Sequence, residues 1–223
     1  MTPVLAQGFK AECEEISREY RGELGLGRED RFDPWALAEH LHIDVDSIFD
    51  LRESEKRDVR RLTKLDQDGF SAATAFCGSR CRILFNPALK PVRQRESISH
   101  ELGHILIEHE PTWPPFDEHG RRFSREQEEA EADYMAATLL APEEGVGPIF
   151  ADFGRDLGAA GDHLGISVRL MRQRIEECCP PSPLLLEAEA TATTLAEEDF
   201  DGSLPRANRL ADASPEASLE CEG

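Results

Sequence analysis

The sequence predicts a domain of the α+β class, in which a small antiparallel sheet packs on several helices. Apolar residues recur at helical spacing in several segments, and three short segments have the composition of strands. At 223 residues, the chain is long enough for one domain with a sizeable core. We expect a helical segment at 1–29, the main domain at 30–179 and an acidic, disordered tail at 180–223, where large apolar residues are few.

Two predicted helices precede the sheet. Residues 6–21 are rich in Ala, Glu, Lys and Arg and carry spaced apolar side chains, which is typical of an amphipathic helix. A second, short helix is expected after Asp33, because an aspartate N-cap followed by Pro34 at the first helical position favours a helix start. Trp35 and Leu37 are expected on its buried side.

Three segments favour strands. They read HIDVDSIF, GFSAATAFC and RILFN, and a turn around Gly78 joins the last two. Two cysteines flank this turn, Cys77 and Cys81, and they could form half of a zinc knuckle. No second cysteine pair stands at metal-ligand spacing, so a plain hairpin turn is the better interpretation. We expect most of the six cysteines to be thiols.

Three further helices are predicted after the sheet. Pro91 opens the first, and the prolines from Pro111 onward close it. Its core-facing stripe consists of Ile98, Leu102, Ile105 and Leu106. The second helix runs from an N-cap at Ser124 to residue 140. The third, SVRLMRQRIEE, begins after a cap at Ser167.

The charge of the chain excludes some classes of partner. There are 45 acidic and 25 basic residues, which give a formal net charge of −20 at pH 7. Such a surface repels phosphates, so direct binding to nucleic acid or to an anionic membrane is not expected, whereas a basic protein would suit it. Because the sequence shows neither a leader-like N-terminus nor a long apolar run, we expect a soluble, cytoplasmic protein.

The strongest chemical motif is SHELGHILIEHE, residues 99–110. His100 and His104 are one helical turn apart, so both imidazoles can reach one metal ion. Zinc catalysis also needs a carboxylate that can take a proton from water, and Glu101 directly follows the first histidine. The spacing therefore predicts two zinc ligands and a catalytic base. The alternative, a surface helix with two solvated histidines, fits poorly with the core-facing stripe on the same helix.

A third protein ligand is needed, and several downstream side chains could supply it. The candidates are His109, His119, Glu126, Glu128, Glu129 and Glu131. His109 is one residue short of the third histidine of the metzincin pattern, so the next helix is the better source. Its inward stripe is inferred from Ala132, Ala136 and Leu140. Glu129 and Asp133 lie on or beside this stripe, whereas Glu131 falls nearer to the solvated side and is the weaker candidate. Asp133 could accept a hydrogen bond from the second ring nitrogen of a ligand histidine.

These motifs resemble the ImmA/IrrE metallopeptidases. The resemblance covers about residues 30–178 and rests on DPWALAEHLHIDV, on ILFNPALKPVRQRESISHELGHILIEH and on EEAEADYMAATLLAP. It implies a zincin-like fold with Glu101 as the catalytic base. One zinc ion, or manganese in its place, would be held by His100, His104 and Glu129. Members are intracellular peptidases that cleave a helix-turn-helix repressor, which implies a repressor of mobile-element or stress-response genes as the protein substrate.

Two other functions stay open. A regulatory binding protein could keep the zinc site for structure and sequester a repressor or toxin without cutting it, although a structural site needs no base such as Glu101. A DNA-binding regulator is suggested by HLGISVRLMRQRI, in which a basic helix follows a turn. A packing helix with solvated arginines explains that segment better, because the whole chain is so acidic.

Overall fold

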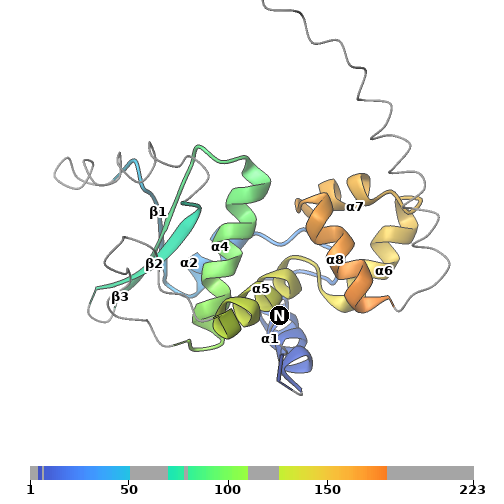
Figure 1. Ribbon diagram of the computed structural model, residues 1–223, viewed down its shortest axis with the longest axis horizontal. Helices are drawn as coiled ribbons and strands as arrows, with labels where there is room; N and C mark the ends of the chain where they lie inside the picture. Colours follow the sequence, from blue (N-terminus) through green and yellow to red (C-terminus); the bar gives the residue numbers. More distant parts are fainter. Residues whose placement is uncertain (1–4, 7, 51–69, 78–79, 110–125, 180–223) are drawn as a thin grey trace, which may run out of the picture. The chain divides into compact units, whose positions relative to one another are not determined.

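Seven helices and a three-stranded sheet make up the described part of the chain (Figure 1), and the predicted α+β class is confirmed. The computed structural model describes residues 5–6, 8–50, 70–77, 80–109 and 126–179. The predicted turn at Gly78, the N-cap at Ser124, the candidate ligand His119 and the acidic tail lie outside these ranges. Within them, no helix is both long enough and apolar enough to cross a membrane.

The sheet is mixed, which corrects one detail of the predicted fold. Its strands are β1 (Asp44–Ser47), β2 (Ala72–Cys77) and β3 (Arg80–Phe85), in the order β1-β3-β2. The expected antiparallel pairing holds for β2 and β3, where Thr74 lies opposite Ile83. The prediction is wrong for β1, which runs parallel to β3. A tight turn forces consecutive strands to be antiparallel, but the long connection from β1 leaves its direction open, and sequence alternation does not encode direction.

Helix α4 (Pro91–Leu106) packs on the sheet and on helix α5 (Glu126–Leu140) (Figure 1). Pro91 opens α4 as predicted, and Ile98 and Leu102 of the predicted stripe are fully buried. The helix ends before Pro111, at Leu106, because Glu108 adopts a left-handed conformation with φ 56°. The predicted inward face of α5 is also confirmed, since Ala132, Ala136 and Leu140 are all buried.

The two helices come closest at Gly103 of α4 and Ala132 of α5. A Cβ atom on Gly103 would lie 2.7 Å from the carbonyl oxygen of Ala132 and 3.3 Å from its Cα. Real Cβ atoms do not approach backbone so closely, so only glycine allows this separation of the helix axes. The contact lies between the two histidines of the motif along α4, and it brings the faces that carry the candidate ligands together.

Helix α1 (Phe9–Glu23) holds the C-terminal end of α5. The Ser17 hydroxyl donates a hydrogen bond to the carbonyl of Thr138 (3.0 Å), and Arg21 Nη1 donates to the carbonyl of Leu139 (2.9 Å). These carbonyls lie in the last helical turn, where the helix has no backbone N–H left to donate to them. The division of the chain at residue 29 stays a prediction, but α1 packs directly on the helix that carries Glu129.

The remaining helices are α2 (Pro34–His40), α6 (Glu143–Asp152), α7 (Leu157–Leu164) and α8 (Val168–Cys178). The predicted caps are confirmed, because Asp33 accepts from the Trp35 N–H and Ser167 accepts from the Leu170 N–H. Helices α6 and α7 are not predicted, since glycines and Pro148 lower their intrinsic helical preference and packing has to compensate. Together, α7, the turn at Gly165 and α8 form the turn-then-helix segment noted in the sequence.

Arg174 of α8 differs from the solvated arginines expected there. Its side chain is fully buried, and it donates hydrogen bonds to the carbonyl of Ala141 (2.8 Å) and to the Glu14 carboxylate of α1 (2.6 Å). The guanidinium also lies 5.5 Å from the ring centre of Tyr134. Arg174 therefore joins α1, α5 and α8 around one buried charge.

Candidate metal centre

The structure brings His100 and His104 of α4 together with Glu129 of α5. The two Nε2 atoms are 3.1 Å apart, and they lie 3.2 Å and 3.7 Å from the Glu129 carboxylate oxygens. In the described part of the chain, this is the one group of at least three His, Cys, Asp or Glu side chains that could hold a metal ion. Their side chains are 20%, 15% and 31% exposed, so the group is accessible to a substrate.

The donor set fits a catalytic zinc site. Zinc binds nitrogen and oxygen at about 2.0–2.2 Å, so tetrahedral geometry places neighbouring ligand atoms about 3.4 Å apart. The three distances among the Nε2 atoms and the carboxylate oxygens given above lie close to this value. Two imidazoles and one carboxylate also leave a fourth position open, as catalytic zinc sites do. The arrangement is therefore compatible with an ion without movement of either helix.

Asp133 lies beside the first histidine of the motif. Its Oδ1 atom lies 2.8 Å from Nδ1 of His100, on the opposite side of the ring from the nitrogen that faces Glu129. A carboxylate at this position fixes the ring orientation and keeps a proton on Nδ1, which leaves Nε2 available to bind a metal ion. Asp133 is one helical turn after Glu129, so α5 supplies both groups.

His104 has a different support, which the sequence did not predict. Its Nδ1 atom lies 2.8 Å from Nδ1 of His109, and Nε2 of His109 lies 3.0 Å from Oε2 of Glu131. Both His109 and Glu131 were candidate third ligands, but here they contact each other. The side chain of Glu131, expected nearer to solvent, is only 20% exposed, whereas that of Glu129 is 31% exposed.

Glu101 lies on the sheet side of α4. Only 1% of it is exposed, and its Oε2 atom accepts two hydrogen bonds from Thr74 of β2, one from the backbone N–H (2.8 Å) and one from the hydroxyl (2.7 Å). The strand therefore orients the carboxylate that follows His100 in the sequence. Thr74 was missed because the strand pattern carries no signal for a side chain that contacts a distant helix.

The two motif histidines differ in their pKa values. Burial lowers the pKa of His100, but hydrogen bonds to Asp133 and Glu129 outweigh burial and raise it to about 9. Burial and the nearby charge of His100 lower the pKa of His104. The pair therefore carries one positive charge at neutral pH, on His100, because two imidazolium ions would repel each other at this distance.

Comparison with known proteins identifies the family. The family model described as the IrrE N-terminal-like domain, of the M78 peptidases, matches residues 54–176, which is more than half of the chain. The chain belongs to the ImmA/IrrE family. A search of curated proteins finds no match. The match covers β2, β3, the helices α4 to α7 and α8 as far as Glu176, so it includes all the candidate site residues of this ImmA/IrrE chain.

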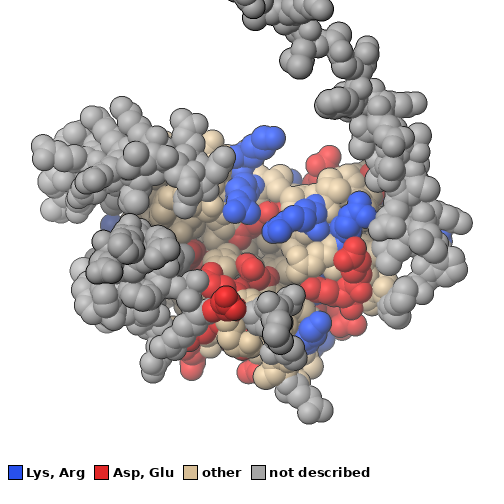
Figure 2. Space-filling model, in the orientation of Figure 1, with Lys and Arg blue, Asp and Glu red and all other residues tan. Residues whose placement is uncertain are grey.

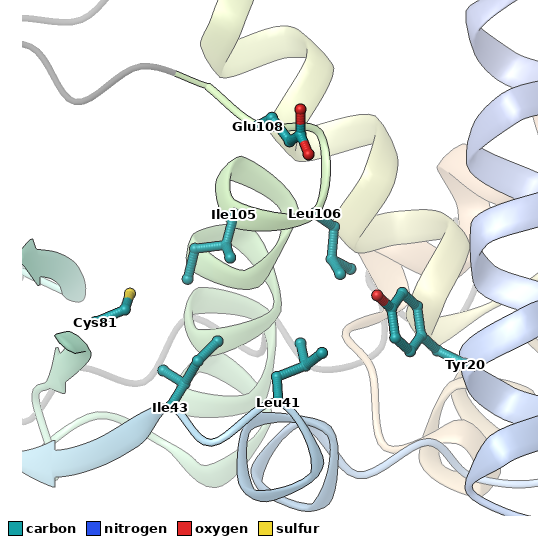
Figure 3. A pocket seen from close by; sticks show the side chains of 7 residues that line it. All are labelled: Tyr20, Leu41, Ile43, Cys81, Ile105, Leu106 and Glu108. Atoms are coloured by element: carbon teal, nitrogen blue, oxygen red, sulfur yellow. The ribbon is translucent and has the colours of Figure 1, made fainter. Parts of the chain in front are cut away.

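The ImmA/IrrE chain also has a pocket that is separate from the candidate metal centre. It has a volume of about 310 Å³ and lies at the C-terminal end of α4, where Ile105 and Leu106 line it together with Tyr20 of α1 and Ile43 next to β1 (Figure 3). Neither the motif histidines nor Glu129 line it. This pocket therefore contributes no residue to the candidate ligand set.

Proposed function

We propose that this protein is a zinc-dependent endopeptidase. His100, His104 and Glu129 would hold the ion, for which manganese could substitute, and Glu101 would be the catalytic base. The observation that supports this most strongly is the pairing of Glu101 with Thr74, because it orients a buried carboxylate beside the ligand set. A site that held zinc for structure alone would need no such carboxylate.

The chemistry of the protein groups follows from their positions. A zinc ion in this site would supply Lewis-acid catalysis and make a bound water more acidic. Glu101 would take a proton from the water that attacks the peptide carbonyl and would return it to the leaving nitrogen. Thr74 would keep the carboxylate oriented through both transfers. Hydrolysis would proceed without a covalent intermediate between the enzyme and its substrate.

We infer that the substrate is a basic protein, and specifically a helix-turn-helix repressor. The resemblance of the motifs to repressor-cleaving peptidases supports this, and so does charge. Helix α5 carries acidic residues in its first turn, Glu126, Glu128 and Glu129. Figure 2 shows further acidic side chains gathered around this part of the molecule. A surface of this kind steers a basic partner toward the candidate site, and the association would slow as salt rises.

The test uses as its probe a purified helix-turn-helix repressor, the product of any small repressor gene that adjoins this one. With zinc or manganese present, wild-type protein should cut it, and mass spectrometry should locate the cut. Glu101→Gln should keep the metal but lose cleavage, whereas His100→Ala should lose both. Glu108→Gln is the matched control, because Glu108 is an exposed carboxylate just beyond the same helix.

Two outcomes would contradict the proposal. Full cleavage by Glu101→Gln would rule out this carboxylate as the base. A stable complex of wild-type protein with the repressor, with zinc bound and no cleavage over hours, would instead identify a zinc-stabilised binding protein. Metal content, measured by elemental analysis of the same samples, separates a failure of the base from a failure of the site.

A further inference from the structure

The chain just beyond α4 folds back onto the second histidine of the motif. The backbone N–H of His109 donates to the carbonyl of His104 (3.0 Å), and the N–H of Glu108 donates to the carbonyl of Ile105 (3.1 Å). With Glu108 in the left-handed region at φ 56°, this is the Schellman arrangement that ends many helices. Glycine is the usual residue at that position, so the chain accepts an uncommon conformation where His109 turns back.

The side chains continue the same contact. His104 Nδ1 faces His109 Nδ1 at 2.8 Å, and His109 Nε2 faces Glu131 Oε2 at 3.0 Å. The other oxygen of Glu131 accepts from the Gln127 amide at 2.7 Å. The side chains of His109 and Glu131 are only 11% and 20% exposed. Four residues from α4, the turn after it and α5 thus form one row of hydrogen bonds that starts at His104.

Only one arrangement of protons satisfies this row if His104 binds a metal ion. A histidine that binds through Nε2 carries its proton on Nδ1, so His104 is the donor in the first bond. His109 must then accept at Nδ1, and its own proton must lie on Nε2. That proton is donated to Glu131, which as a carboxylate can only accept. Each bond fixes the direction of the next.

We propose that His109 and Glu131 are positioning residues that hold His104 in the tautomer and orientation required for metal binding. This inference rests on the proposed role of His104 as a ligand. It gives the two motif histidines different supports: Asp133 contacts His100 directly, whereas a neutral imidazole stands between His104 and its carboxylate. In this role, His109 and Glu131 orient a metal ligand and do not bind the ion themselves.

The experiment measures zinc affinity by competition with a chelator at one fixed pH. His109→Leu and Glu131→Ala should each bind zinc about 10- to 100-fold more weakly than wild type, as expected for loss of a group that supports a metal ligand. Glu131→Gln should stay within about threefold of wild type, because an amide oxygen can still accept from His109. His40→Leu is the matched control, since His40 also contacts a carboxylate, Glu23, at 2.7 Å but far from the ligand set in the sequence.

A second readout tests the tautomer directly. Long-range ¹H–¹⁵N correlation spectra of the imidazole rings in the zinc-loaded protein should show the proton of His109 on Nε2 and the proton of His104 on Nδ1. In Glu131→Ala, the Nε2–H signal of His109 should shift or broaden, whereas the signals of His100 should not. A purely structural contribution of Glu131 to folding would not single out one ring in this way.

Three results would overturn the inference. These are a His109 ring with its proton on Nδ1, zinc affinity in His109→Leu equal to that of wild type, or equal losses in Glu131→Gln and Glu131→Ala. If wild-type protein itself bound no zinc, the proposed function would fail together with the inference. Wild-type binding with unchanged variants would instead contradict the positioning role alone.

Discussion

Gly103 of α4 and Ala132 of α5 are in backbone contact, and no other residue type fits at position 103 without moving one of the helices. The two helices carry the whole candidate ligand set, with two histidines on one and Glu129 on the other. Their separation at this contact therefore determines how far the Glu129 carboxylate lies from the imidazoles. The glycine of the motif is thus as important for the geometry of the site as the candidate ligands are for its chemistry.

Gly103→Ala should weaken both the fold and the site. The added methyl would meet backbone atoms that cannot rotate away, so we expect a loss of about 1–3 kcal/mol in the free energy of unfolding. Zinc affinity should also fall. Gly22→Ala in α1 is the matched control, because nothing lies within 4 Å of its added methyl, and it should be neutral or stabilising by up to about 1 kcal/mol. Chemical denaturation measures the free energy of unfolding, and chelator competition measures zinc affinity. Equal changes of both quantities in Gly103→Ala and Gly22→Ala would contradict the packing argument.

Zinc affinity should depend on pH through His100. Because its pKa is raised to about 9, His100 is an imidazolium ion in the metal-free protein at neutral pH. Metal binding must release the proton from the ring nitrogen that binds the ion. The apparent dissociation constant should therefore fall about tenfold for each unit of rising pH, until the pKa is reached and the curve flattens. His104 should release no proton, because its pKa is lowered.

Asp133→Asn provides the comparison for this pH dependence. The amide removes the negative charge that raises the pKa of His100, so the affinity curve should flatten at a lower pH than in wild type. Chelator competition across a pH series measures both curves, and calorimetry in buffers of different ionisation enthalpy counts the protons. Affinity that is constant from pH 6 to pH 8 in wild type would show that His100 is already neutral.

The acidic residues of α5 should differ in their effects on metal binding. Glu129→Ala removes a ligand candidate and should cause the largest loss of zinc, beyond the loss in Glu131→Ala. Glu126→Ala is the control for net charge, since Glu126 is exposed in the first turn of the same helix. Elemental analysis after dialysis ranks the three variants. A larger loss of zinc in Glu131→Ala than in Glu129→Ala would indicate that Glu131, and not Glu129, is the third ligand.

Arg174→Met should destabilise the fold without removing any ligand. The change leaves Glu14 without its buried partner and the Ala141 carbonyl without its donor, so we expect a loss of about 3–5 kcal/mol in the free energy of unfolding. Arg169→Met, at an exposed position on the same helix, should stay within about 0.5 kcal/mol of wild type. If Glu14→Gln combined with Arg174→Met costs as much as the two single changes summed, the ion pair is not coupled.

The fold could be predicted where local chemistry decides the structure. Asp33, Pro91 and Ser167 start helices because their backbone and side-chain properties act within a few residues. The direction of β1 and the helices α6 and α7 could not be predicted in the same way. They depend on packing against segments far away in the sequence, and periodicity within one segment contains no information on that packing.

The candidate site shows the same limit. Helical spacing was sufficient to pair His100 with His104 and to place Glu129 on or beside the inward face of the next helix, because each repeat of about 3.6 residues fixes a face. The choice of Glu129 as the third ligand came from the resemblance to the ImmA/IrrE metallopeptidases. Contacts that cross between elements, such as Thr74 with Glu101 and His109 with Glu131, required the structure. Gly103 did leave a signal: a glycine inside a helix lowers its stability by about 1 kcal/mol, so its presence suggests a close contact.

The attachment of α5 at its far end links metal occupancy to the integrity of the domain. Ser17 and Arg21 of α1 and Arg174 of α8 hold the last turn of the helix and the residue that follows it, whereas Glu129 lies in its first turn. Local unfolding that released α1 or α8 would leave α5 held mainly by its packing on α4, which would loosen the position of Glu129 relative to the histidines. By thermodynamic linkage, an ion bound to all three ligands must in return suppress that unfolding, so the ion would protect helices that it never contacts.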